Sequence, residues 1–222
     1  MKKSLIVLIL AGLTMFLGGC VSGGNNVRGT GDVVTRIMDV EDFSAIDISG
    51  SYIVVYRQAQ TTALTVVMQE NLFDYLQVET RGDTLQIGSR RGFDTSTANR
   101  PRLYIYAPNL TAASFSGAAN ATDWDTLEGE GFSLNISGAG NVGIGLDVEQ
   151  LDISVSGAGD ITLWGSADDI NINGSGALTI SASDLEISGG RVDISGAGNV
   201  TLSSLTNVEV NTSGVARVRA AN

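Results

Sequence analysis

Apolar and polar residues alternate with a period of two along most of this chain, and the alternation restarts at nearly even intervals. In the C-terminal half each restart carries a glycine-rich heptapeptide, which reads Asn-Ile-Ser-Gly-Ala-Gly-Asn at 135–141 and recurs in close form at 154–160, 171–177 and 193–199. Weaker copies lie at 114–120 and 211–217. Because the side chains of a strand point to opposite faces in turn, each copy predicts a strand, a tight corner and a second strand.

The first glycine of each copy gives the repeat length. These glycines are Gly117, Gly138, Gly157, Gly174, Gly196 and Gly214, separated by 21, 19, 17, 22 and 18 residues. A period of about 20 residues is typical of a solenoid, in which each repeat packs only on its neighbours.

The residues two positions before these glycines are mostly aliphatic and are expected to point inward. Stacking the repeats about 4.8 Å apart would place Ile136, Val155, Ile172 and Ile194 in one interior column. The intervening polar residues are expected to face water; in the position just before the glycine they are Ser116, Ser137, Ser156, Asn173, Ser195 and Ser213. The pattern predicts an all-β protein, a parallel β-helix.

The glycines themselves are expected to form the corners. A corner between two strands needs a residue that tolerates positive φ or lacks a Cβ atom. The glycines expected to be structural for this reason are Gly117, Gly138, Gly140, Gly157, Gly159, Gly174, Gly176, Gly196, Gly198 and Gly214.

The N-terminus has the features of a targeting segment. Lys2 and Lys3 precede an apolar run at 5–17 that is too short for a membrane span. Leu-Gly-Gly-Cys at 17–20 resembles the lipobox of bacterial lipoproteins, in which the cysteine is lipidated and becomes the new N-terminus. Cys20 is the single cysteine of the chain, so no intramolecular disulfide is expected. Ordinary secretory cleavage that leaves a free thiol is the alternative.

Composition and pattern divide the chain into a signal peptide, a linker and a two-part head. Residues 1–19 are expected to be the signal peptide, and 20–31 the lipidated cysteine with a flexible Gly/Ser/Asn linker. Residues 32–112 read as strands without strict repeats, an irregular β half that caps or continues the regular β-helix of 113–222. Within it, 45–50 resembles a seventh, degenerate copy of the corner, and 76–87 predicts a β-hairpin around Arg81-Gly-Asp-Thr.

Charge excludes some partners. Loss of Lys2 and Lys3 with the signal peptide changes the formal net charge from −11 to −13. A chain this acidic is a poor ligand for nucleic acid or anionic lipid headgroups. The membrane is therefore expected to be a partner only through lipid on Cys20. No cofactor or metal is expected.

Four features together resemble the bacterial head GIN domain family, described as auto-transporter adhesin heads. They are the lipobox with its linker, Asp-Phe-Ser-Ala-Ile at 42–46, the Arg-Gly-Asp-Thr-Leu hairpin at 81–85 and the serial Ser-Gly-Ala-Gly turns. The resemblance covers about residues 40–222. It implies a right-handed β-helical head on an exported, often lipidated protein of the outer membrane or cell surface, and it supplies no catalytic residues. A surface protein or glycan partner is expected, and a homo-oligomer is left open.

A carbohydrate-active enzyme is the alternative function, since some parallel β-helices cleave polysaccharides. The chain has no histidine, so acid and base chemistry would fall to carboxylates. The candidates, expected mostly in return loops, are Asp123, Asp125, Asp147, Asp152, Asp168 and Asp169. Trp124 and Trp164 are expected in or near the same loops, where they either stack on sugars or cover a coil edge. A non-catalytic head is the preferred interpretation.

Overall fold

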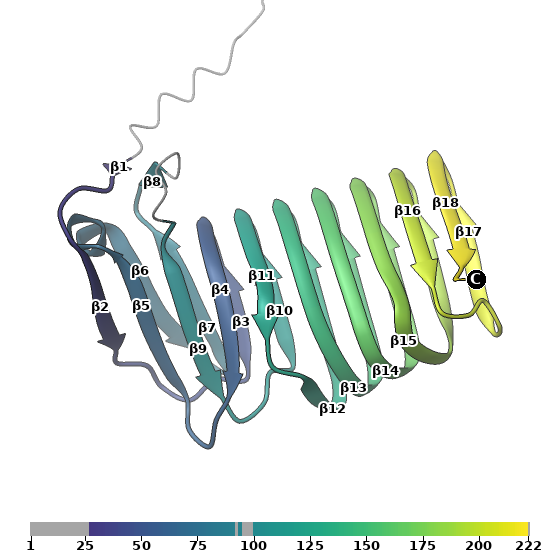
Figure 1. Ribbon diagram of the computed structural model, residues 1–222, viewed down its shortest axis with the longest axis horizontal. Helices are drawn as coiled ribbons and strands as arrows, with labels where there is room; N and C mark the ends of the chain where they lie inside the picture. The colour runs from purple at the N-terminus through teal and green to yellow at the C-terminus, as the bar shows by residue number, and fades with distance from the viewer. Residues whose placement is uncertain (1–26, 92, 95–99, 222) are drawn as a thin grey trace, which may run out of the picture.

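The computed structural model describes residues 27–91, 93–94 and 100–221. The expected signal peptide, Cys20 and most of the linker lie outside these residues. Strands dominate the described chain, and they stack side by side along one long axis from the N-terminal half to the C-terminal end (Figure 1). The helical structure described is the 3₁₀ helix η1, Glu70–Tyr75, and no described helix has the length and hydropathy of a membrane span.

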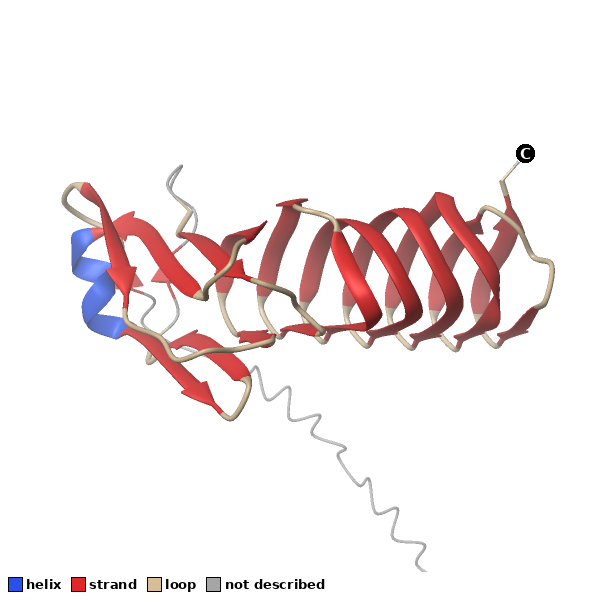
Figure 2. Cartoon of the chain, turned by 90° about the horizontal axis from the view of Figure 1, so that it is seen from below, coloured by secondary structure: helices blue, strands red, loops and turns tan. Residues whose placement is uncertain are grey.

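The C-terminal half is a parallel β-solenoid, as the repeat predicts. Successive coils pair in parallel, β12 with β13, β13 with β14 and β14 with β15, and the two sides of the solenoid are visible in Figure 2. Its strands are β10 (Ala112–Phe115), β11 (Ala118–Trp124), β12 (Leu127–Ile136), β13 (Ala139–Val155), β14 (Ala158–Gly174), β15 (Ala177–Ile194), β16 (Ala197–Leu202), β17 (Val208–Thr212) and β18 (Val215–Ala220).

The register predicted from the sequence is wrong for one repeat, at 171–177. In the structure Gly174 pairs with Val155 on one side and Ile194 on the other, so it occupies an interior position of β14 and not a corner. The corner is Gly176, and the true spacings from Gly117 to Gly214 are therefore 21, 19, 19, 20 and 18 residues.

The predicted interior column is consequently correct in three of its four members. Ile136, Val155 and Ile194 share a column, whose fourth place is taken by Gly174. Ile172 is also buried but lies in the next column, between Ile153 and Val192. The shift is two residues, and because strand side chains alternate with period two, the face of each residue is still the predicted one.

The corner glycines are explained by close approach. A Cβ atom on Gly157 would collide with the carbonyl oxygen of Gly138, and each other corner glycine from Gly117 to Gly214 meets the preceding corner in the same way. This closeness allows a hydrogen bond from each residue after the corner, such as Ala158 N–H to Gly138 O at 2.9 Å.

The second glycines of three other heptapeptides are not corners. Gly140, Gly159 and Gly198 lie inside β13, β14 and β16, two residues beyond the corner. A Cβ on Gly140 would lie 3.0 Å from Ile136 Cδ1, and one on Gly159 would lie 3.2 Å from Val155 Cγ1. Gly140 and Gly159 therefore leave room for the large side chain that precedes the corner, and Gly198 leaves room for Leu178 of the preceding coil.

The N-terminal half both continues and caps the solenoid. The sequence 45–50 does form a further coil: β3 (Ala45–Ile48) and β4 (Ser51–Gln58) flank the corner Gly50 and pair in parallel with β10 and β11. β7 (Thr84–Ser89) and β9 (Arg102–Ala107) extend the two sides in parallel. Antiparallel strands then close this end: β2 (Val33–Met38), β5 (Ala63–Gln69) and β6 (Leu76–Arg81), with the short pair β1 (Val27–Arg28) and β8 (Phe93–Asp94) beside them. The predicted hairpin is β6–β7.

Candidate functional site

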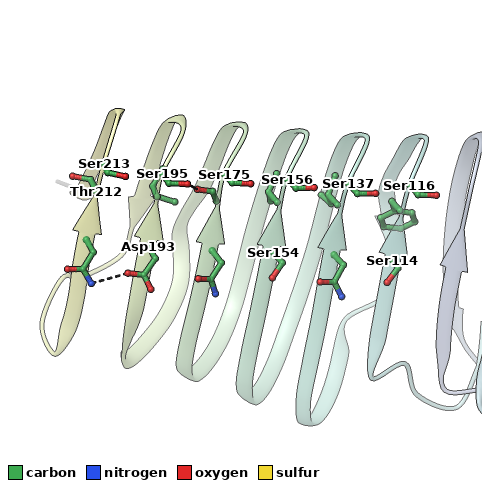
Figure 3. A pocket seen from close by; sticks show the side chains of 18 of the residues that line it. Ser114, Ser116, Ser137, Ser154, Ser156, Ser175, Asp193, Ser195, Thr212 and Ser213 are labelled. Atoms are coloured by element: carbon green, nitrogen blue, oxygen red, sulfur yellow. Dashed lines mark hydrogen bonds between the residues drawn. The ribbon is translucent and has the colours of Figure 1, made fainter.

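Two columns of small polar side chains line the outer surface of the strands that precede the corners. The column next to the corner is made of serine hydroxyls, contributed by Ser116, Ser137, Ser156, Ser175, Ser195 and Ser213 (Figure 3). The column two residues earlier mixes carboxylates, amides and hydroxyls, contributed by Asp47, Ser114, Asn135, Ser154, Asn173, Asp193 and Asn211. These residues line one hollow, which we call the serine groove.

The sequence predicted the outward orientation of these residues but missed one serine. Asn173 was expected next to the corner, where the structure has Ser175, and Asn173 lies in the other column. The tripeptide Ser-Gly-Ala would have given the correct alignment, because it occurs at 175–177 as at 116–118, 137–139, 156–158 and 195–197.

The groove has the dimensions of an extended binding surface. Its volume is about 1020 Å³, just above the 300–1,000 Å³ that a small-molecule pocket occupies, and it runs from β3 to β17. Polar groups recur about every 4.8 Å from coil to coil and about 6.6 Å along each strand. A ligand lying along the solenoid axis would therefore meet the same pair of groups at every coil.

The floor of the groove is nearly neutral. Asp47 and Asp193 are the two acidic residues that line it, and no basic side chain does so within the described residues. Asp193 is held by an ion pair with Arg191 at 2.5 Å and by a hydrogen bond from Asn211 Nδ2 at 2.9 Å. These hydrogen bonds, chiefly that from Arg191, lower the pKa of Asp193. The groove thus offers hydroxyl and amide hydrogen bonds in place of a strong field.

Acidic residues considered for catalysis are not brought together in the groove. Asp123 and Asp125 both contact Arg57, at 2.7 and 3.7 Å, and hydrogen bonding to Asp123 raises the pKa of Arg57. Asp147 accepts a hydrogen bond from Ser166 Oγ at 2.8 Å.

The remaining candidates lie on strands β13 and β14, outside the serine groove, and not in the return loops where they were expected. Asp152 accepts a hydrogen bond from Asn171 Nδ2 of the next coil at 3.1 Å, and Asp168 and Asp169 are exposed on β14. Within the described part of the chain no group of three or more acidic, histidine or cysteine side chains is placed to hold a metal ion.

The two tryptophans have different environments. Trp124 is buried among Tyr56, Phe115 and Phe132, with ring centroids 5.6 to 6.5 Å away, and its Nε1–H donates to Val54 O at 3.0 Å. Trp124 is thus a core residue at the end of β11, and the expectation that it stacks on sugars or covers an exposed coil edge was wrong. Trp164 is 39% exposed on the outer face of β14.

The chain resembles known proteins in sequence and in fold. Residues 42–222 match the family described as putative auto-transporter adhesin, head GIN domain. The chain belongs to this family. The resemblance noted from the sequence is thereby confirmed, and the β-solenoid of this GIN head is its expected architecture. Among curated proteins none matches the sequence.

Solved structures share the fold of this GIN head at low sequence identity. A putative adhesin from Bacteroides fragilis has a TM-score of 0.79 and 21% identity, with 88% of this chain and 100% of that chain covered. A putative lipid binding protein from Parabacteroides distasonis has a TM-score of 0.63 and 20% identity, covering 89% and 100%. A putative adhesin from Parabacteroides merdae has a TM-score of 0.63 and 19% identity, covering 89% and 99%. These relatives establish the fold of the GIN head.

Proposed function

We propose that this chain is a non-catalytic binding head of the bacterial cell envelope, anchored by lipid on Cys20, and that it binds an uncharged surface glycan along the serine groove. The observation that carries this proposal is the repetition of one hydroxyl and one polar side chain at every coil of a groove about 1020 Å³ in volume. Membership of the GIN head family and the adhesin relatives support the adhesive role.

Neutral glycans fit the groove for an electrostatic reason. Anionic polysaccharides would be repelled by a chain of net charge −11, and among the residues that the structure describes no basic side chain lines the groove to offset that repulsion. A neutral glycan presents hydroxyl groups along its whole length, and serine and asparagine both donate and accept hydrogen bonds. Each net hydrogen bond contributes only about 0.5–1.5 kcal/mol, so useful affinity requires contacts at several coils.

A non-catalytic role is supported by the environment of the carboxylates. Glycoside hydrolysis uses two carboxyl groups about 5–9.5 Å apart across the bound sugar. In this chain Asp123 and Asp125 are engaged by Arg57, and Asp193 in the groove is engaged by Arg191 and Asn211. These carboxylates are held as acceptors of fixed hydrogen bonds.

The groove is tested by a triple variant and a matched control on the same fold. Ser137→Ala, Ser156→Ala and Ser175→Ala together remove three hydroxyls from adjacent coils, at exposed positions that leave the core intact. The control replaces Asn141, Thr179 and Asn199 by alanine, which are exposed just beyond the corners on the other side. On a glycan array the groove variant should bind about a hundredfold more weakly than the parent, from three hydrogen bonds of about 1 kcal/mol each.

Three outcomes would contradict the proposed function. Equal losses in the two triple variants would mean that the groove is not the binding face. If the parent protein bound no glycan on the array, neutral glycans would be excluded as its ligands. Cleavage of a polysaccharide that an Asp123→Asn or Asp125→Asn variant abolishes would make the protein an enzyme.

The anchor is tested separately. In a bacterial host, the full chain should incorporate labelled palmitate and sediment with membranes, and Cys20→Ala should do neither. Two or three acyl chains, at about 0.8 kcal/mol per buried CH₂, would hold the protein firmly to the bilayer. Unlabelled, soluble parent protein would contradict lipidation while leaving the groove proposal untouched.

A further inference from the structure

Trp164 lies on the side of the solenoid that follows the corner, away from the serine groove. It occupies an outward position of β14, where its register partners are Gly145 on the preceding coil and Asp184 on the following coil. The side chain is 39% exposed, whereas Trp124 is 7% exposed and packed in the aromatic core. Trp164 is therefore the tryptophan available to a ligand.

The indole ring of Trp164 rests on a floor of two glycines. A Cβ atom on Gly145 would lie 2.5 Å from Trp164 Nε1 and 3.1 Å from Cε2, and one on Gly143 would lie 3.6 Å from Cζ3. The two ends of the ring thus lie over two outward positions of one strand, which means that the ring spreads along β13. The backbone of β13 therefore lies against one side of the indole, while the residue as a whole stays 39% exposed.

This seat depends on glycine at position 145. Any side chain there would occupy the place of the indole nitrogen and force the ring away from the sheet. Outward positions of neighbouring coils carry threonine, serine or aspartate, so a pair of glycines on this face is a local feature that matches the single large ring beside it.

Polar groups surround the ring. Thr126 Oγ1 lies 3.0 Å from the point that a Gly145 Cβ would occupy, next to Trp164 Nε1, and Thr122 lies beside Gly143. Thr162 is two residues earlier on β14, and Asp184 is the register partner on β15; all four side chains are exposed. A flat apolar surface is therefore bordered by hydroxyls and one carboxylate.

We propose that Trp164 is the stacking platform of a second carbohydrate site, which takes a neutral pyranose unit. A pyranose has an apolar C–H face that packs on an aromatic ring and a rim of hydroxyls that need donors and acceptors, the combination found around Trp164. Asp184 accepts from a sugar hydroxyl and disfavours uronic or sialic acids. The site shares no residue with the serine groove and does not depend on it.

Affinity electrophoresis of the full chain tests this site. The parent protein should be retarded in gels that contain one of a panel of soluble neutral polysaccharides, such as hydroxyethyl cellulose, xylan or galactomannan. Trp164→Ala should raise the dissociation constant about tenfold or more, and Trp164→Phe, which keeps an aromatic face, should stay within about threefold of the parent. Gly145→Ala should weaken retardation because it displaces the ring.

Two controls separate stacking from general hydrophobicity and from the groove. Leu205→Ala removes an apolar side chain of similar exposure, 37%, and should migrate as the parent does. The triple serine variant of the groove should keep its Trp164-dependent retardation. Polysaccharide should also shield the exposed indole from acrylamide quenching of fluorescence, and this shielding should vanish in Trp164→Ala.

The assignment fails on any of three results. They are retardation of Trp164→Ala equal to that of the parent, an equal loss in Leu205→Ala, or no retardation of the parent by any polysaccharide of the panel. Urea denaturation midpoints within error of the parent establish that each variant is folded. If Trp164→Ala were unfolded, unchanged quenching of the folded parent by acrylamide in the presence of every polysaccharide would still refute the site.

Discussion

Gly174 and Leu178, which reverse the usual order of large residue and glycine around a corner, give the sharpest test of how the coils pack. In the regular repeats a large residue precedes the corner and a glycine follows it, as in Val155 with Gly159. The coil of β14 and β15 has the reverse arrangement, with Gly174 before the corner and Leu178 after it. A Cβ on Gly174 would collide with Leu178 Cδ2, so the two positions share one interior space.

Each single exchange should be costly. Leu178 is 4% exposed, and its replacement by glycine would remove a buried side chain, worth about 2–5 kcal/mol for Leu→Ala, plus about 0.5–1 kcal/mol for glycine in a strand. Gly174→Val would overpack the same space, at about 1–3 kcal/mol or more. If the sites were independent, the double variant would lose the sum, roughly 4–9 kcal/mol.

The double variant Gly174→Val with Leu178→Gly should instead be close to the parent. It recreates the arrangement of Val155 and Gly159 one coil earlier, so we expect a loss of about 1 kcal/mol, which against the sum of the single losses is a coupling free energy of about 3–8 kcal/mol. Guanidinium denaturation of the parent, the two single variants and the double variant measures this cycle. A double variant that loses the full sum of the single losses would refute the shared space.

Two further predictions concern a corner glycine and a buried tyrosine. Gly157→Ala should cost more than about 3 kcal/mol or prevent folding, since its Cβ would strike Gly138 O, while Gly143→Ala, with ordinary 3.6 Å contacts, should change the denaturation midpoint little. Burial raises the pKa of Tyr56 to about 12, so the stability that this residue contributes is complete below pH 10 and is lost as pH rises toward 12. In Tyr56→Phe, alkaline unfolding followed by circular dichroism should therefore shift to higher pH. The denaturation midpoint of the same variant at neutral pH measures the separate cost of losing the 3.1 Å hydrogen bond to Ala107 O. An unchanged alkaline midpoint, corrected for that neutral-pH loss, would contradict the role of Tyr56.

Period and polarity were sufficient to predict the solenoid, because both are local properties of the sequence. Alternation determines which side chains face inward, and a shift of two residues does not alter it. Ile172 was for that reason placed inside correctly even though its column was wrong. Register is a property of pairs of coils, and at 171–177 two glycines could each serve as the corner when only one repeat is considered.

The choice between Gly174 and Gly176 depends on three-dimensional packing. Gly176 fits because its backbone approaches the carbonyl oxygen of Gly157, and Leu178 fits because Gly174 leaves space for it. Neither contact is visible in the hydropathy of the chain. The seat of Trp164 was hidden for the same reason, since Gly143 and Gly145 are about 20 residues away in sequence and adjacent only after a coil has closed.

The reversed positions of Gly174 and Leu178 also show that the interior of a repeat can change while its surface stays the same. Both residues point inward, so the core of this coil departs from its neighbours. Asn173 and Ser175, the outward residues on either side of Gly174, remain aligned with the two columns of the serine groove. A parallel coil permits this because interior and exterior positions alternate along one strand and pack against different neighbours. Packing changes in the core can therefore accumulate without disturbing the spacing of the polar groups, provided that the corner stays fixed. The corner glycines are the elements that couple the two faces, since a displacement there would shift the inner and outer columns together.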